Sequence, residues 1–169
     1  GRPVRKMTSW DDAHCIATYM YSQALSRDER YLFFASDRTG ILQLYRVDTA
    51  SGETAQVTDI PPEPRADIGG IICWCSVHAE LQELFYCSGQ GIFAVDVKTL
   101  EERVITRPEP GRVVFAFPMA SFMADGRHVI VTSRLADGHP AVCLADVRGG
   151  PMEVVYRWPD PKGEIDHLL

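Results

Sequence analysis

Apolar and polar residues alternate along the chain in short runs, which is the pattern of β-strands and not of amphipathic helices. Three of these runs, at 42–48, 91–96 and 141–146, end in an aspartate that is followed by a polar turn. The aspartates Asp48, Asp96 and Asp146 recur at intervals of 48 and 50 residues. An internal period of this length is typical of repeat architectures, so the repeat decides the fold prediction.

The neighbouring strands recur in the same order. Each aspartate is followed by a further strand, at 54–58, 102–106 and 152–156. Upstream of each aspartate run lies an apolar strand, at 31–36, 83–88 and 128–133. An innermost strand is expected before each of these, near residues 19–26, 70–77 and 113–123. The sequence therefore predicts an all-β protein with four short strands in every repeat.

Four-stranded units that recur every 45 to 50 residues or so are the blades of a β-propeller. We expect about three blades, at approximately 16–62, 69–110 and 113–159, with the start of a further blade at 164–169, in one partial domain 1–169. A β-sandwich fits less well, because its strands do not recur as matched quartets. A closed ring typically takes four to eight blades, so the chain is interpreted as a truncated part of a larger propeller, and its open blade edges are candidates for self-association.

Composition excludes several functions. The net charge of -6 argues against nucleic-acid binding, which needs a basic surface, and no apolar run is long enough for a membrane span. The five cysteines are irregularly spaced and form no C-x-x-C pair, so we expect buried small hydrophobic residues, and not disulfides or a metal site. This cysteine usage favours a reducing, cytoplasmic location.

The Ser-Asp-Arg-Thr-Gly run at 36–40 follows a predicted second strand. Gly40 can adopt a positive φ, and Asp37 can accept hydrogen bonds from nearby backbone N–H groups, as a tight turn requires. Together with the strand that ends in Val47 and Asp48, this run resembles the WD40-like repeat of TolB-type propellers. The motif indicates a fold and not a chemical function.

A narrower resemblance spans most of the chain. His14 and the Tyr-Met-Tyr run at 19–21, the Gly-Gly-Ile-Ile run at 69–72, and the segment 93–102 are similar to the N-terminal region of oligogalacturonate lyases. The resemblance implies a seven-bladed parent, a polysaccharide lyase that cleaves pectin-derived oligogalacturonides by β-elimination with a histidine base and manganese or a similar divalent cation. It also implies that this chain is a fragment, roughly the first half of that protein, and inactive alone.

The same resemblance nominates site residues. His167 takes the place of the general base at the start of a fourth blade, although the glycine and proline that flank the family's histidine are missing here; a histidine without catalytic duty is the alternative. Arg134 and Arg148 are candidates for the catalytic arginine, and substrate-binding residues are unknown. The family's metal ligands lie in later blades, so we expect no metal site and no cofactor in this chain. The spacing of the remaining histidines suggests no ligand set, and we expect solvent exposure for two of them: His128 and His139.

A second hypothesis is a non-catalytic propeller, similar to TolB or to the propeller of prolyl-oligopeptidase-type peptidases, that acts as a binding or gating module. Clustered histidines in further blades would favour the lyase, whereas a G-x-S-x-G segment and an α/β pattern would favour the peptidase.

Overall fold

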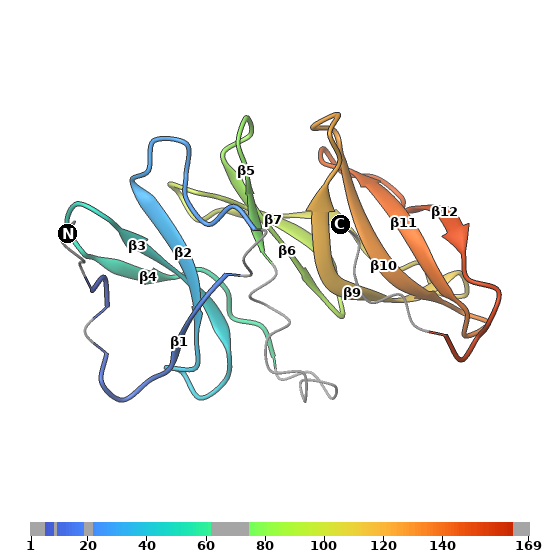
Figure 1. The fold of residues 1–169 in the computed structure, drawn as a ribbon, viewed down its shortest axis with the longest axis horizontal. Coiled ribbons are helices and arrows are strands. Elements are labelled where there is room, and N and C mark those ends of the chain that lie inside the picture. The colour runs from blue at the N-terminus through green and yellow to red at the C-terminus, as the bar shows by residue number, and fades with distance from the viewer. Residues whose placement is uncertain (1–5, 9, 19–21, 62–74, 164–169) are drawn as a thin grey trace, which may run out of the picture.

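In the computed structural model of the 169-residue chain, the described residues are 6–8, 10–18, 22–61 and 75–163, with side chains described for all of them except 114–120. These residues form three four-stranded antiparallel sheets, and none of them is helical (Figure 1). The all-β blade architecture predicted from the sequence is therefore confirmed. The described part of the chain contains no helix with the length and apolar character that a membrane crossing requires.

Each sheet is one blade, and its strands follow one another in chain order. The first blade contains β1 (Cys15–Ala17), β2 (Tyr31–Ser36), β3 (Gln43–Asp48) and β4 (Thr54–Gln56). The second contains β5 (Ser76–His78), β6 (Glu83–Ser88), β7 (Gly91–Asp96) and β8 (Glu102–Thr106). The third contains β9 (Val113–Phe122), β10 (His128–Leu135), β11 (Pro140–Asp146) and β12 (Glu153–Arg157).

The antiparallel order gives every blade two distinct ends. The turns after its first and third strands lie at one end, which we call the aspartate end because the third strand finishes there in the repeated aspartate. The turn after the second strand and the link to the next blade lie at the other end, the linker end. In Figure 1 the aspartate end is uppermost, where the first-to-second-strand turns of the three blades rise side by side.

The innermost strands depart from the prediction at two places. In the first blade the strand was expected near 19–26, but β1 pairs with β2 at Cys15–Ala17, and only an isolated bridge joins Leu25 to Leu32. All three β1 residues are exposed, and a strand of three residues is too short to show the apolar alternation on which the prediction relied. In the second blade β5 is described at Ser76–His78, and most of the predicted strand 70–77 lies outside the described residues, as does the predicted start of a fourth blade at 164–169.

The repeated aspartate caps the turn between the third and fourth strands. Asp48 Oδ1 accepts the backbone N–H groups of Ala50 and Ser51 at 2.9 and 3.0 Å. Asp96 Oδ1 accepts those of Lys98 and Thr99 at 2.8 and 2.7 Å. In the third blade the carboxylate accepts one backbone N–H in the same way. The repeat is therefore conserved within the chain for a physical reason, because the side chain satisfies donors that the tight turn leaves unpaired.

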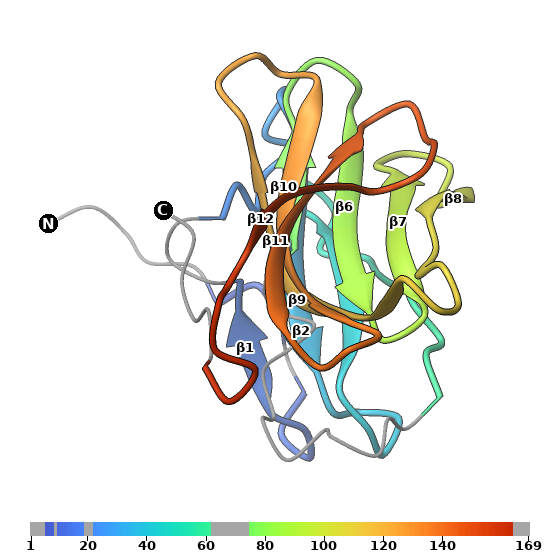
Figure 2. The ribbon, with the colours of Figure 1, turned by 90° about the vertical axis from the view of Figure 1, so that its right-hand side faces the viewer.

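Two hydrophobic clusters hold neighbouring blades together, and β6 contributes to both. Leu84 and Tyr86 face the cluster shared with the first blade, whereas Phe85 and Cys87 face the cluster shared with the third. Successive side chains of a strand point to opposite faces of its sheet, so a strand between two packed neighbours is apolar on both. Figure 2 shows the third blade in front of β6 and β7, seen from its outer side.

A third, smaller cluster covers the outer face of the first blade. Met7 and Trp10, ahead of β1, pack against Phe34, Tyr45 and Val47. The Trp10 ring lies 5.8 Å from that of Phe34 and 5.1 Å from that of Tyr45. The segment before the first strand therefore shields a blade face that would otherwise expose aromatic surface.

Cys15, Cys87 and Cys143 carry free thiols. Cys75, Cys87 and Cys143 are buried, as predicted, but Cys15 is exposed in β1, and Cys73 lies outside the described residues. Complete burial raises the pKa of the Cys87 thiol to about 12, because the thiolate cannot be solvated there.

Candidate functional site

The predicted general base, His167, lies outside the described residues, so its place in the fold stays a prediction. Among the described side chains, no group of three or more His, Cys, Asp or Glu residues could hold a metal ion. The donors of this part of the chain therefore do not fit the divalent cation that the resemblance implies.

A histidine–aspartate pair lies at the linker end of the first blade. His14 precedes β1 and Asp37 follows β2, and the antiparallel pairing of Cys15 with Ser36 brings the two opposite one another. The backbone N–H of His14 donates to Asp37 Oδ1, and its ring Nδ1 lies 2.8 Å from Oδ2. One carboxylate thus fixes both the main chain and the imidazole.

The pair has a defined protonation pattern. The hydrogen bond from the His14 ring, reinforced by that from its backbone, lowers the pKa of the Asp37 carboxyl below its usual value of 3.8. An ionised carboxylate only accepts, so Nδ1 carries the proton and a neutral His14 presents Nε2 as its lone pair. The side chain is 88% exposed, which leaves Nε2 accessible to a ligand in solution. A histidine oriented by a carboxylate in this way can act as a general base.

Asp37 was expected to stabilise its own turn, and in the structure other atoms take that role. The Arg38 N–H donates to Ser36 Oγ at 3.3 Å, and the Gly40 N–H donates to the Asp37 carbonyl at 2.8 Å. Gly40 has the predicted positive φ, at +93°. The Asp37 carboxylate is thereby released for His14, which lies 23 residues earlier in the chain.

The next residue in the chain after Asp37 is a cation, Arg38. The Arg38 guanidinium lies 4.2 Å from the centroid of the Trp10 ring, within cation–π distance. None of the ion pairs among the described residues involves Arg38, so its charge is available to an anionic ligand. The linker end of the first blade therefore combines a base with a positive charge.

The two predicted arginines lie at opposite ends of the third blade. Arg134, near the end of β10, donates through Nη1 to the carbonyls of Gly138 and Pro161 at 2.6 and 3.1 Å. It therefore fastens the β10–β11 turn to the chain after β12 at the linker end. Arg148 is exposed in the β11–β12 turn at the aspartate end, and its described hydrogen bond is made by its backbone N–H. Of these two, only Arg134 shares an end with His14.

The remaining histidines have structural partners. His78 is 5% exposed; the Leu81 N–H donates to its Nδ1, so its Nε2 carries the proton and donates to the Gly126 carbonyl at 2.8 Å. This bond joins the second blade to the third. The solvent exposure expected for His128 and His139 is corrected to half-burial, because Nδ1 of His128 lies 2.6 Å from the Asp125 carboxylate and Nδ1 of His139 bonds a backbone carbonyl.

Comparison of the sequence with protein-family models and with curated proteins gave no match. Solved structures match the fold. An oligogalacturonate lyase from Vibrio parahaemolyticus aligns at 18% identity with a TM-score of 0.72, covering 89% of this chain and 43% of that chain. An oligogalacturonate lyase in complex with manganese aligns at 17% identity with a TM-score of 0.70, covering 86% and 42%. A TolB-type protein from Agrobacterium tumefaciens aligns at 19% identity with a TM-score of 0.54, covering 89% and 51%.

The chain thus spans about two fifths of the length of the lyases that it matches. Identities below one fifth establish the fold and leave the chemistry to the residues. The three blades therefore form part of a β-propeller, and their arrangement is similar to that in oligogalacturonate lyases.

Proposed function

We propose that this chain supplies three blades of a propeller lyase that cleaves pectin-derived oligogalacturonides by β-elimination. The observation that carries the proposal is that the chain superposes better on the two lyases than on the TolB-type protein. At equal or nearly equal coverage of this chain, the TM-scores are 0.70 and 0.72 for the two lyases and 0.54 for the TolB-type protein. The sequence resemblance to the lyases, which includes His14 and the segment 93–102, supports the same choice.

The reaction sets clear chemical requirements. A base removes the proton α to the uronate carboxylate, the electron pair forms a C=C bond, and the β C–O bond breaks while the leaving sugar oxygen takes up a proton. Positive charge near the carboxylate stabilises the enolate that develops. In this proposal Arg38 binds the uronate carboxylate, and His14 Nε2 and His167 are the two candidate bases. The divalent cation implied by the resemblance would bind to residues of the parent protein beyond the described part of this chain.

The test compares the 169-residue chain with a protein that carries it together with the further blades. Each is incubated with a defined oligogalacturonide and Mn²⁺, and the product is followed by the ultraviolet absorbance of the unsaturated uronide and by mass spectrometry. We expect product from the longer protein and none from the chain alone. A longer protein that binds Mn²⁺ and folds, yet gives no unsaturated product, would refute the proposal.

Three substitutions in the longer protein identify the base. His14→Gln and His167→Gln each remove one candidate, and His128→Gln is the matched control, because His128 also pairs with an aspartate but lies at the aspartate end. We expect kcat to fall by a factor of about 10² to 10⁴ in one of the first two variants and to stay unchanged in the control. If neither candidate variant loses activity, the assignment of the base is wrong.

The second candidate function is a propeller that binds its ligand without chemistry. The match to a TolB-type protein over 89% of this chain favours it. In that case the longer protein would bind a ligand, measured by calorimetry, and release it unchanged. Binding of an oligogalacturonide with no elimination product would favour this second function over the lyase.

A further inference from the structure

One position recurs in every blade when the strands are compared by register. It consists of the residue two places before the repeated aspartate and the residue directly opposite it on the fourth strand. The three pairs are Arg46 with Ala55, Ala94 with Arg103, and Leu144 with Glu153.

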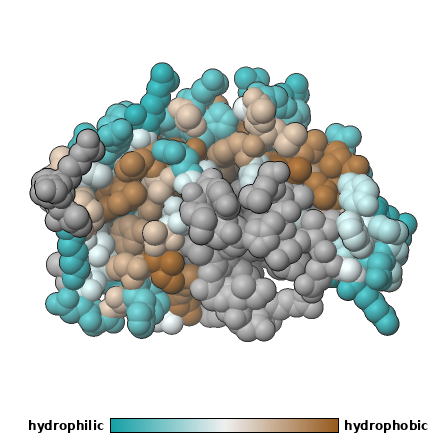
Figure 3. All heavy atoms as spheres, in the orientation of Figure 1, coloured by the Kyte–Doolittle hydropathy of each residue, from teal (hydrophilic) through white to brown (hydrophobic). Residues whose placement is uncertain are grey.

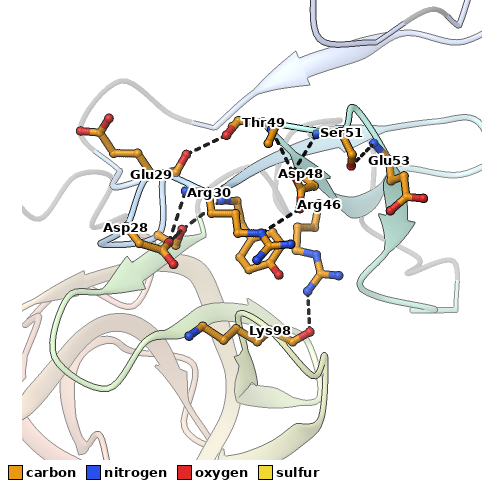
Figure 4. A network of polar contacts seen from close by, with 12 residues as sticks. Asp28, Glu29, Arg30, Arg46, Asp48, Thr49, Ser51, Glu53 and Lys98 are labelled. Atoms are coloured by element: carbon orange, nitrogen blue, oxygen red, sulfur yellow. Dashed lines mark hydrogen bonds and ion pairs between the residues drawn. The ribbon is translucent and has the colours of Figure 1, made fainter.

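In the first two blades this position holds a guanidinium that reaches the next blade. Arg46 Nη1 donates to the carbonyl of Val97 at 2.7 Å. It also donates to the carbonyl of Lys98 at 2.7 Å (Figure 4). Arg103 Nη2 donates to the carbonyl of Val147 at 2.8 Å. In both cases the carbonyl of the first residue after the next blade's repeated aspartate, Val97 or Val147, accepts one of these bonds. The two arginines come from different strands, the third and the fourth, yet they make the same contact between blades.

The third blade has the opposite chemistry at this position. Leu144 is half-buried, and Glu153 is exposed on β12. The ionised carboxylate of Glu153 can accept hydrogen bonds but cannot donate one. The pair lies on the face that points away from the second blade, because the alternate residues of β11 pack in the cluster shared with that blade. Three large hydrophobic residues at the outer edge are also exposed, at 46, 48 and 39%: Val155, Tyr156 and Trp158. Figure 3 shows hydrophobic residues at the surface over the third blade.

We propose that this outer face binds a further four-stranded blade whose third-to-fourth-strand turn carries a lysine or arginine that pairs with Glu153. A turn carbonyl, the acceptor at the two interfaces described above, would be repelled by the carboxylate, so the partner must present a donor. Turns of the required kind exist within this repeat: Lys98 and Arg148 each stand two residues after their aspartate. The inference rests on the blade architecture and not on the proposed enzymatic function.

The first blade of a second copy of this chain is a poorer partner for the same face. Its first blade would present the turn after Asp48, where Thr49 and Ala50 carry no positive charge. The outer face of that blade is also covered by Met7 and Trp10. Charge complementarity and the covered face therefore both favour a further blade with a basic turn.

The first experiment uses a chain in which residues 76–106 are repeated after residue 163, so that a second copy of the Lys98 turn follows the third blade. Glu153→Gln, and Lys98→Met in the repeated segment, are made singly and together, with Glu101→Gln as an exposed control in another turn. We expect each single change to raise the unfolding equilibrium constant by about two- to fivefold, and the double variant to raise it no further than either single variant. If the double variant changes the unfolding equilibrium constant by the product of the two single effects, the two residues do not pair and the proposal is overturned.

The second experiment uses the 169-residue chain itself and does not depend on the folding of the extended protein. Sedimentation velocity is expected to give a monomer. A dimer that Glu153→Arg or Tyr156→Asp disperses would mean that a second copy occupies the outer face, and would overturn the proposal.

Discussion

Arg46 provides a quantitative test of the contact between the first two blades, and the change to make is Arg46→Met, which keeps the aliphatic part of the side chain. The guanidinium makes two hydrogen bonds of 2.7 Å to backbone carbonyls. One carbonyl is that of Val97, which is fully buried, and the other is that of Lys98, which is exposed. It also lies 4.3 Å from the centroid of the Tyr31 ring.

The loss can be estimated from these contacts. A hydrogen bond from a charged group to the Val97 carbonyl contributes about 1.5–3 kcal/mol, and the cation–π contact adds about 0.5–1 kcal/mol. Water can replace the bond to the exposed Lys98, so that bond adds little. We therefore expect Arg46→Met to lower the free energy of unfolding by about 2–4 kcal/mol.

The matched control is Arg30→Met. Arg30 also bonds a partner, Asp48 at 2.9 Å, but within its own blade and with 59% of its side chain exposed, so its loss should cost much less than the loss of Arg46. Urea unfolding of both variants and of the wild type is monitored by circular dichroism. The comparison requires that the dependence of the free energy of unfolding on urea concentration is the same in all three proteins. Equal, small losses in the two variants would refute the role of Arg46 in joining the blades.

Three further predictions concern the turn, the acid range and the thiols. Gly91→Ala should destabilise by at least about 2 kcal/mol in urea unfolding, because a Cβ there would lie 2.3 Å from the Thr106 carbonyl oxygen at a φ of +143°; a wild-type midpoint would contradict this. Hydrogen bonds from the Ser51 N–H and from Arg30 lower the pKa of Asp48 from 3.8 to about 2, so the contribution of this carboxylate to stability is complete above pH 4 and is lost as the pH falls toward 2. Asp48→Asn should remove that part of the pH dependence of the urea midpoint, and a variant with the same pH profile as the wild type would contradict this. In the native protein a maleimide should label Cys15 well before Cys87, as peptide mass spectrometry would show, and equal rates would contradict the burial.

The sequence was sufficient to place the strands that repeat, because each carries an apolar run and a terminal aspartate. The strands β6, β7 and β8 begin and end at the predicted residues. The short strand β1 could not be located in this way, since three residues are too few to show an alternation. Its true position depends on pairing with the far half of β2, which is tertiary information.

The candidate site was less accessible to sequence reasoning. His14 and Asp37 are 23 residues apart and meet only through the register of β1 with β2. A histidine just before one strand and an aspartate just after the next is a detectable signal, provided that the two strands are known to pair. Arg46 and Arg103 were equally hidden, because they lie on different strands and align only across the sheet.

The central claim is that successive four-strand repeats pack side by side, and backbone hydrogen bonds between blades test it most directly. The Val77 N–H donates to the Gln23 carbonyl at 2.8 Å between the first two blades, and the Gly150 N–H donates to the Ile105 carbonyl at 3.1 Å between the second and third. A long-range HNCO experiment on the labelled protein measures the scalar coupling through each bond. We predict couplings for both pairs. Couplings within each sheet but for neither of these pairs would contradict the packing of the blades.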